Sequence, residues 1–209
     1  MNYVDLKSAV RDTVEINIPD ADLNVLIKQA EQLIFQTAQP PALRKNVTAT
    51  VTIGNKYLEL PTGFLYLFSL AAIKANGDYE YLLNKDVNFI RECYPDAADT
   101  GLPKHYAVFD ANTLILGPAP DAAYSVELHC AAYPESIVTA GTTWLGDAFD
   151  AALLNGTLMQ AIRFTKGSEI DLKTYENLYT QAMILFKQFA DGKLRQDTYR
   201  NGQARNEVR

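Results

Sequence analysis

The sequence predicts an α+β protein: a helical bundle built from the N- and C-terminal helices, an inserted antiparallel β unit, and a flexible C-terminal tail. Apolar residues recur with helical spacing near both ends of the chain. Between these ends they alternate with polar residues or form short runs bounded by Gly, Pro and Asn, as in β-strands. The expected boundaries are 1–45 and 144–192 for the two parts of the helical domain, 46–143 for the β domain and 193–209 for the tail.

The N-terminal part contains two predicted helices. The first covers Tyr3–Val14, with Val4, Ala9 and Val10 as inner positions. The second begins at a cap formed by Asp20 or Asp22 and ends before Pro40-Pro41. Its inner positions follow the i, i+3, i+4 spacing and are Leu23, Leu26, Ile27, Ala30, Leu33 and Ile34.

The period changes to two after residue 46. Threonines alternate with Val47, Ala49, Val51 and Ile53, which predicts a half-buried strand. A tight turn at Gly54-Asn55 would return the chain antiparallel through Tyr57–Leu60.

A second hairpin and a short helix are expected next. Phe64–Ala75 is a nearly continuous apolar run, typical of a central strand. Asn76-Gly77 is the strongest hairpin signal in the chain and leads into Tyr79–Leu83. Asp86 is the expected cap of a helix over Val87–Tyr94, which Pro95 ends.

Three strands are predicted within Gly101–Tyr133. Lys104–Phe109 and Thr113–Leu116 flank an Asp-Ala-Asn turn, and Ala123–Ala132 follows after Pro118 and Pro120 interrupt the ladder.

Two helices end the folded part. Asp147 is the expected cap of the first, whose apolar residues cover most of its circumference, so we expect it to lie buried between neighbours. The second starts at Asp171 and stops at Gly192. Its expected inner positions are Leu172, Tyr175, Leu178, Tyr179, Ala182, Leu185, Phe186 and Phe189.

Catalytic and metal-binding patterns are weak. His105 and His129 lie about 24 residues apart in predicted strands, without a Cys or carboxylate at metal-ligand spacing. Ser125 and Cys130 share a strand with His129, but the chain contains no G-x-S-x-G elbow. We therefore expect structural histidines and no hydrolase.

Carboxylate pairs and loops also favour structural roles. Asp147 and Asp150 suit a helix start, and Asp96 and Asp99 suit a solvated loop. The prolines of residues 117–121 remove amides that a phosphate-binding loop needs. Cys93 and Cys130 are expected as reduced thiols. We expect no enzyme activity, no cofactor and no metal.

Charge is unevenly distributed along the chain. Residues 193–209 hold five basic against two acidic residues, a balance of +3, so the remainder of this chain of net charge −6 carries −9. An acidic body should not grip nucleic acid, and it would suit the wall of a channel through which DNA slides. The chain shows neither a signal-peptide pattern nor a run near the roughly 18 apolar residues of a membrane span. We expect a soluble protein made in the cytoplasm.

Several motifs together resemble the head-to-tail adaptor proteins of tailed bacteriophages, of the tail tubular protein A, tail accessory factor or gatekeeper-ring type. These are Leu60-Pro61-Thr62-Gly63-Phe64-Leu65, the Gly101–Tyr133 strands with their Pro-x-Pro-Asp, and Thr143-Trp144-Leu145 before an Ala- and Leu-rich helix. Their order and spacing match over roughly residues 1–190. Gly63 and His129-Cys130 differ from the family's more usual residues.

The resemblance implies a non-enzymatic structural protein of the virion neck, assembled in the host cytoplasm. Its implied partners are the portal protein ring, the tail nozzle or tail tube protein, and further copies of itself in a homo-oligomeric ring, with a dodecamer expected. DNA would pass through this ring without sequence-specific binding, and no membrane is involved. The basic tail is the implied portal-docking segment, through Lys193, Arg195, Tyr199, Arg200, Arg205 and Arg209.

Other interpretations stay open at the level of sequence. The tail can be a solubilising segment without a partner. The whole chain can also be a stopper or tail-completion protein, or a virion protein that binds carbohydrate or cell wall through its β unit.

Overall fold

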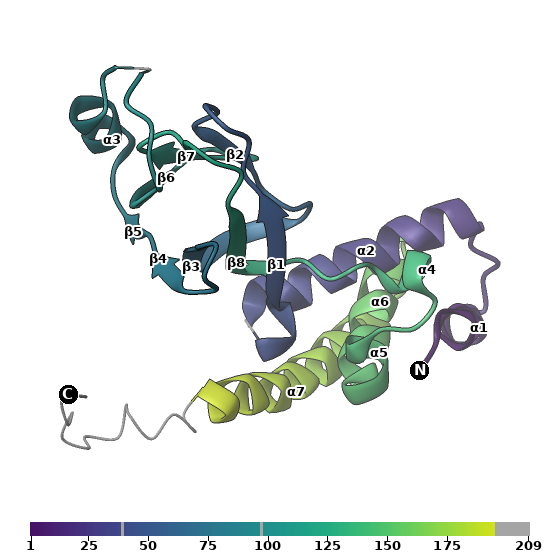
Figure 1. Cartoon of the computed structure of the whole chain (residues 1–209). Coiled ribbons are helices and arrows are strands. Elements are labelled where there is room, and N and C mark those ends of the chain that lie inside the picture. The colour runs from purple at the N-terminus through teal and green to yellow at the C-terminus, as the bar shows by residue number, and fades with distance from the viewer. Residues whose placement is uncertain (39, 97, 195–209) are drawn as a thin grey trace. The chain divides into compact units, whose positions relative to one another are not determined.

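The structure is a computed structural model that describes residues 1–38, 40–96 and 98–194, the last four of these (191–194) by backbone only (Figure 1). Over these residues the chain forms seven α-helices, one short 3₁₀ helix and eight β-strands, so the α+β prediction is confirmed. The predicted flexible tail begins at residue 193, and residues 195–209 lie outside the described part.

Contacts divide the chain into two compact units. A helical unit consists of Met1–Ala42 together with the residues from Glu135 onward, and a β unit consists of Leu43–Pro134. Helices from both ends of the sequence thus share one unit, as the apolar stripes require, because neither set alone can bury its stripe.

Helix α6 (Asp150–Thr165) is the centre of the helical unit. It packs against the helices α1 (Tyr3–Val14), α2 (Asp20–Thr37), α5 (Trp144–Ala148) and α7 (Glu169–Leu194). The short helix α4 (Ile137–Ala140) packs on α2. Buried residues lie on most sides of α6: Ala152, Leu153, Gly156, Thr157, Leu158, Met159, Ala161 and Ile162. The prediction of a helix buried between neighbours is confirmed.

The predicted caps of two helices are wrong. The N-cap position of α2 is Pro19, because Asp20 is the first residue of the helix and its carboxylate is engaged by cations of α1. Asp147 lies inside α5, which is capped by Thr143 through a hydrogen bond from the Gly146 amide. Helix α6 begins at Asp150 without a side-chain cap.

The last helix is longer than the sequence predicts. It starts at Glu169 rather than Asp171, since the Ser168 hydroxyl accepts a hydrogen bond from the Ile170 amide at 3.2 Å. Gly192 lies within α7 and does not end it. A single glycine costs a helix only about 1 kcal/mol relative to alanine, which a long helix can absorb.

The inner face of α1 also differs from the prediction. Leu6 and Val10 are buried, whereas Val4 is exposed. The i, i+4 pair at positions 6 and 10 thus sets the buried face.

The β unit contains two four-stranded sheets. The first, fully antiparallel, has the order β1 (Arg44–Thr50), β8 (Ser125–Ala132), β3 (Phe64–Ile73), β4 (Tyr79–Tyr81). The second has the order β2 (Tyr57–Glu59), β7 (Thr113–Gly117), β6 (His105–Asp110), β5 (Leu83–Asn84), with β5 and β6 parallel. The central strand β3 and the hairpin at Asn76-Gly77 are confirmed.

The two sheets share one apolar core. Its buried members come from both sheets and the links between them: Val51, Leu58, Leu70, Ala72, Leu82, Tyr106, Leu114, Leu116, Val126, Leu128 and Cys130. Helix α3 (Val87–Cys93), capped by Asp86 as predicted, covers part of the second sheet through Ile90. Gly117 permits this packing, because a Cβ there would lie 2.6 Å from the Tyr94 ring.

The predicted hairpin between residues 47–53 and 57–60 is wrong. A turn does occur, with the Asn55 amide donating to the Thr52 carbonyl at 3.0 Å. However, β1 pairs with β8 and β2 pairs with β7, so the turn carries the chain from one sheet to the other. This route buries Val51 and Leu58 in the shared core and leaves Ala49 and Ile53 exposed.

The three strands predicted within Gly101–Tyr133 are confirmed. The strands β6 and β7 form a hairpin in the second sheet, and β8 lies in the first.

Candidate assembly surfaces

The two histidines lie on different sheets. His105 is on β6, with its Nδ1 3.0 Å from the Tyr94 hydroxyl and its ring edge-on to Phe89. Burial and the nearby Lys85 and Lys104 lower the pKa of His105, which favours the neutral ring. His129 is on β8 and stacks on Phe68 at 4.8 Å between ring centroids. Both rings serve local packing.

The nucleophile candidates are not assembled around a histidine base. Ser125 is exposed at the start of β8, while Cys130 lies in the core, where burial raises the pKa of its thiol. Cys93 is an exposed free thiol at the end of α3. Within the described residues, no group of three or more His, Cys, Asp or Glu could hold a metal ion.

The carboxylate candidates have local roles. Asp96 accepts a hydrogen bond from the Ala98 amide at 2.9 Å, which closes its own turn together with the bond from the Asp99 amide to the Asp96 carbonyl. Asp147 and Asp150 are exposed on α5 and α6.

A hollow of about 210 Å³ lies between α3 and β7, beside Asp96 and Asp99. It is lined by both signs of charge, including Lys56, Arg91 and Asp99. It is smaller than the roughly 300–1,000 Å³ of ordinary ligand sites.

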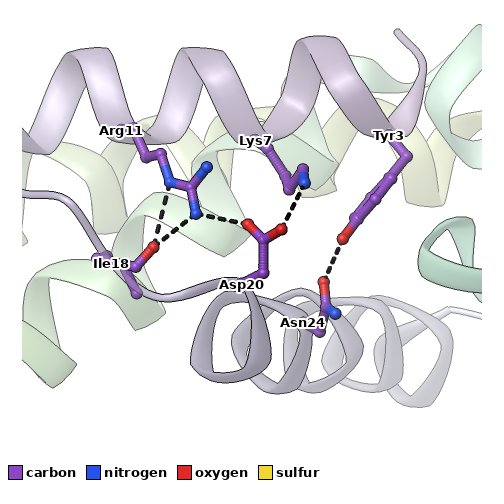
Figure 2. Close-up of polar contacts among 6 residues, drawn as sticks. All are labelled: Tyr3, Lys7, Arg11, Ile18, Asp20 and Asn24. Atoms are coloured by element: carbon purple, nitrogen blue, oxygen red, sulfur yellow. Dashed lines mark hydrogen bonds and ion pairs between the residues drawn. The ribbon is translucent and has the colours of Figure 1, made fainter.

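A polar network fixes α1 against the start of α2 (Figure 2). The Asp20 carboxylate accepts from Arg11 at 2.6 Å and from Lys7 at 3.1 Å. Arg11 also donates to the Ile18 carbonyl, and the Tyr3 hydroxyl donates to Asn24 at 2.5 Å.

The cations of this network, Lys7 and Arg11, bind groups within the same chain. Hydrogen bonds and attraction from Lys7 and Arg11 lower the pKa of Asp20. Arg11 makes three hydrogen bonds, two to the Ile18 carbonyl in the link and one to Asp20 at the start of α2, so both its position and that of α1 are defined. The network therefore orients a helix and is not a ligand site.

An apolar row lies on the surface of α7, and we name it the α7 stripe: Leu178, Leu185 and Phe189. Their exposed fractions are 41%, 64% and 38%. At 100° per residue, these positions fall within about 40° of one another on the helix. The buried residues Met183, Phe186 and Ala190 occupy an adjacent arc, so the stripe lies beside the internal contact and faces solvent.

Aromatic rings support one end of the α7 stripe. Phe189 contacts Trp144 and Phe149, whose rings also contact the fully buried Phe186. This cluster holds an apolar surface in a fixed shape. Rigid, partly exposed aromatic residues are typical of protein–protein contacts.

The sequence identified the residues of the stripe but assigned them to the wrong environment. Leu178, Leu185 and Phe189 were expected as inner positions, and the structure places them at the surface because Met183, Phe186 and Ala190 take the internal contact. The signal in the sequence was the width of the apolar arc of α7, which exceeds what one helix neighbour can cover.

The predicted portal-docking residues lie at or beyond the end of the described chain. Lys193 is in the last turn of α7. The others, Arg195, Tyr199, Arg200, Arg205 and Arg209, lie outside the described residues. In the described part, no helix is long and apolar enough to cross a membrane.

A family model described as SU10 adaptor protein matches residues 1–208. Among curated proteins, none matches the chain. The match spans both units, and it agrees with the resemblance to phage head-to-tail adaptors, a structural class that is not enzymatic. The chain belongs to the SU10 adaptor protein family.

Proposed function

We propose that the protein is a head-to-tail adaptor that forms a ring between the portal and the tail and extends the DNA channel. The observation that carries this proposal is the family match over residues 1–208. A ring of identical subunits needs a heterologous interface that closes on itself.

The α7 stripe supports self-association. Leu178 and Leu185 leave 41% and 64% of their surface exposed in one copy, and burying apolar surface on assembly yields roughly 25 cal/mol per Å². We therefore assign subunit contacts to the helical unit and contacts with the next tail component, the nozzle or tube protein, to the β unit. The expected ring is a dodecamer.

The basic tail is the proposed portal-docking segment. Its arginines can make forked, charge-assisted contacts with acidic surfaces, and Tyr199 can anchor the segment by packing. The body of the chain, with a charge of −9, is proposed to let DNA pass without sequence-specific binding.

Native mass spectrometry of the full chain, alone and with the portal ring from the same genome, tests the function. We expect one copy of the chain per portal subunit. A protein that ignores the portal but binds a completed neck would instead be a stopper or tail-completion protein.

The role of the tail is tested separately by truncation after Leu194, which preserves α7. We expect the truncated chain to stay folded and to lose portal binding. A matched control replaces Asn201, Gln203 and Asn206 by serine and keeps every charge. Retained binding by the truncated chain would contradict docking through the tail.

A further inference from the structure

The two sheets of the β unit are joined closely on one side and lie apart on the other. On one side the chain passes directly from β4 to β5: the Leu82 amide bonds to Leu70 in the first sheet, and the Leu83 amide bonds to Lys104 beside the second. On the other side the edge strands β1 and β2 diverge after their turn. A groove of about 540 Å³ lies between them. Its apolar lining is Val47, Ala49, Val51, Leu58, Leu60, Val126 and Leu128.

Strand β1 is an exposed edge of the first sheet. It is seven residues long, it contains no proline, and all its residues are exposed except the half-buried Val47. Half of the backbone amides and carbonyls of an edge strand point away from the sheet, so such an edge is a template for another strand. At the opposite edge of the same sheet, β4 is short and displays Tyr79 and Tyr81, exposed by 47% and 64%.

We propose that β1 of one copy pairs antiparallel with β4 of a second copy, so that the first sheet continues from subunit to subunit. Within the sheet every neighbouring pair is antiparallel, and a second copy's β1 placed beside β4 keeps this alternation. The contact joins two different edges and is therefore heterologous, as a ring requires. This inference rests on the proposed self-assembly and specifies one of its interfaces.

Side-chain direction and charge select the register. Lys45 pairs with Cys130 and Glu80 pairs with Ala72, and both partners face the core, so Lys45 and Glu80 point to the same face of the sheet. Placing Glu80 of the second copy opposite Lys45 joins opposite charges. Shifting the pairing by two residues would instead set this carboxylate against Val47.

The outer face of the sheet agrees with this register. It would bring Tyr81 of the second copy opposite Arg44 and Tyr79 opposite Asn46, and all four side chains point outward. Arg44 already lies over the Phe68 ring at 4.8 Å, so a second ring would extend an existing cation–π stack.

The charges of the two edges are also complementary in this register. The edge that carries Arg44 and Lys45 is basic, and the edge that it meets carries the acidic residues Asp78 and Glu80. Glu80 is held within its own copy by Lys74 at 2.7 Å, and it would bridge two lysines after assembly.

Disulfide trapping tests the pairing in the full chain. Both native thiols are first removed: the exposed Cys93 is replaced by serine, and Cys130, which lies directly opposite Lys45 on β8, is replaced by alanine. A Lys45→Cys copy is mixed with a Glu80→Cys copy, alone and with the portal ring, and oxidised under mild conditions. We expect an intermolecular disulfide, since directly opposed residues have Cβ atoms close enough to bridge. The control mixes Thr48→Cys with Glu80→Cys, because Thr48 points to the other face and should stay unlinked.

The outcomes of the trapping experiment distinguish a wrong strand pairing from a wrong function. If rings form by native mass spectrometry but residues 45 and 80 do not link, the strand pairing is overturned and the adaptor function stands. If Lys45→Cys links to itself in preference, the edges pair symmetrically and the proposal is wrong. If no ring forms with or without the portal, both the pairing and the proposed function fail.

Charge reversal gives an independent test. Lys45→Glu or Glu80→Lys alone should reduce the assembled fraction at least tenfold at a fixed protein concentration. The double variant, which exchanges the two charges, should restore assembly. Circular dichroism checks that each variant is folded. Full assembly by both single variants would contradict the register.

Discussion

Asp20 shows how a residue expected to cap a helix takes another role when cations are in reach. Its carboxylate bridges Lys7 and Arg11 across the α1–α2 link rather than capping α2 (Figure 2). The sequence placed the charge at the right helix end but could not reveal the partners, because they lie on another helix.

Asp20→Asn should lower the melting temperature slightly at pH 7. The folded pKa of Asp20 is lowered, so its stabilisation is present above the ordinary pKa and is lost as pH falls through the folded value. The difference between variant and wild type should therefore vanish in strong acid, as followed by thermal denaturation monitored by circular dichroism. Asp22→Asn removes the same charge from the same helix turn and serves as the control. Equal effects of the two variants would exclude a special role for the network.

Glu31 should show the opposite pH dependence. This buried carboxylate on α2 accepts the Ile137 amide at 2.9 Å, at the start of α4, and burial raises its pKa. A raised pKa means that the stabilisation from this group is full at acid pH and is lost as pH rises through the folded value.

Glu31→Gln, which stays neutral and keeps an acceptor oxygen, should match or exceed wild-type stability at pH 7. The two proteins should converge as pH falls below the ordinary glutamate range. Denaturant unfolding at several pH values measures this. A large loss at pH 7 would show that the ionised carboxylate is needed for the hydrogen bond.

At the scale of the element, α7 carries two neighbouring apolar faces with different roles. Met183, Phe186 and Ala190 serve the internal core, whereas the α7 stripe lies at the surface. The adjacent residues Leu185 and Phe186 lie on different faces, one on the α7 stripe and the other in the core. Substitutions at these two positions can therefore test the two roles separately.

Leu185→Ser should change the unfolding free energy of the single copy by less than about 0.5 kcal/mol, because the side chain is 64% exposed. Assembly should nevertheless weaken. Phe186→Ala should cost about 3–5 kcal/mol, since it empties a fully buried site. Urea titration and analytical ultracentrifugation separate the two effects. Unchanged assembly of Leu185→Ser would remove the α7 stripe from the ring interface.

At the scale of the whole molecule, the division into two compact units suggests two folding units. The β unit, Leu43–Pro134, contains both sheets and the whole core between them. The helical unit collects helices from both ends of the sequence. The boundaries of independent domains remain a prediction.

Residues 43–134 expressed alone should therefore give a folded β protein with cooperative thermal unfolding. This size, about 90 residues, is enough for a stable core. Its amide NMR spectrum, compared with that of the full chain, measures the outcome. A collapsed spectrum without dispersion would show that the β unit needs the helical unit. As a control, ending the fragment at Ala123 deletes β8, the strand between β1 and β3, and should abolish folding.

The sequence alone determined the order and type of the longer elements. Helical and two-residue periodicities are local, so α2, α3, α6 and the strands β3, β4, β6, β7 and β8 could be placed within a few residues, whereas the short elements β5, α4 and α5 were not predicted separately. The Asn76-Gly77 turn could be predicted because its backbone requirement is met by two adjacent residues. The motifs also sufficed to identify the adaptor family.

Only the tertiary structure decided which strands pair and which apolar faces stay exposed. The turn at Gly54 looks like a hairpin, but β1 and β2 join different sheets because Val51 and Leu58 are buried between those sheets. The apolar arc of α7 looks like one buried stripe, but its neighbours cover only part of it. Strand pairing and burial depend on residues distant in sequence, and the free energy of burying a side chain is set by what packs on it, not by its own periodicity.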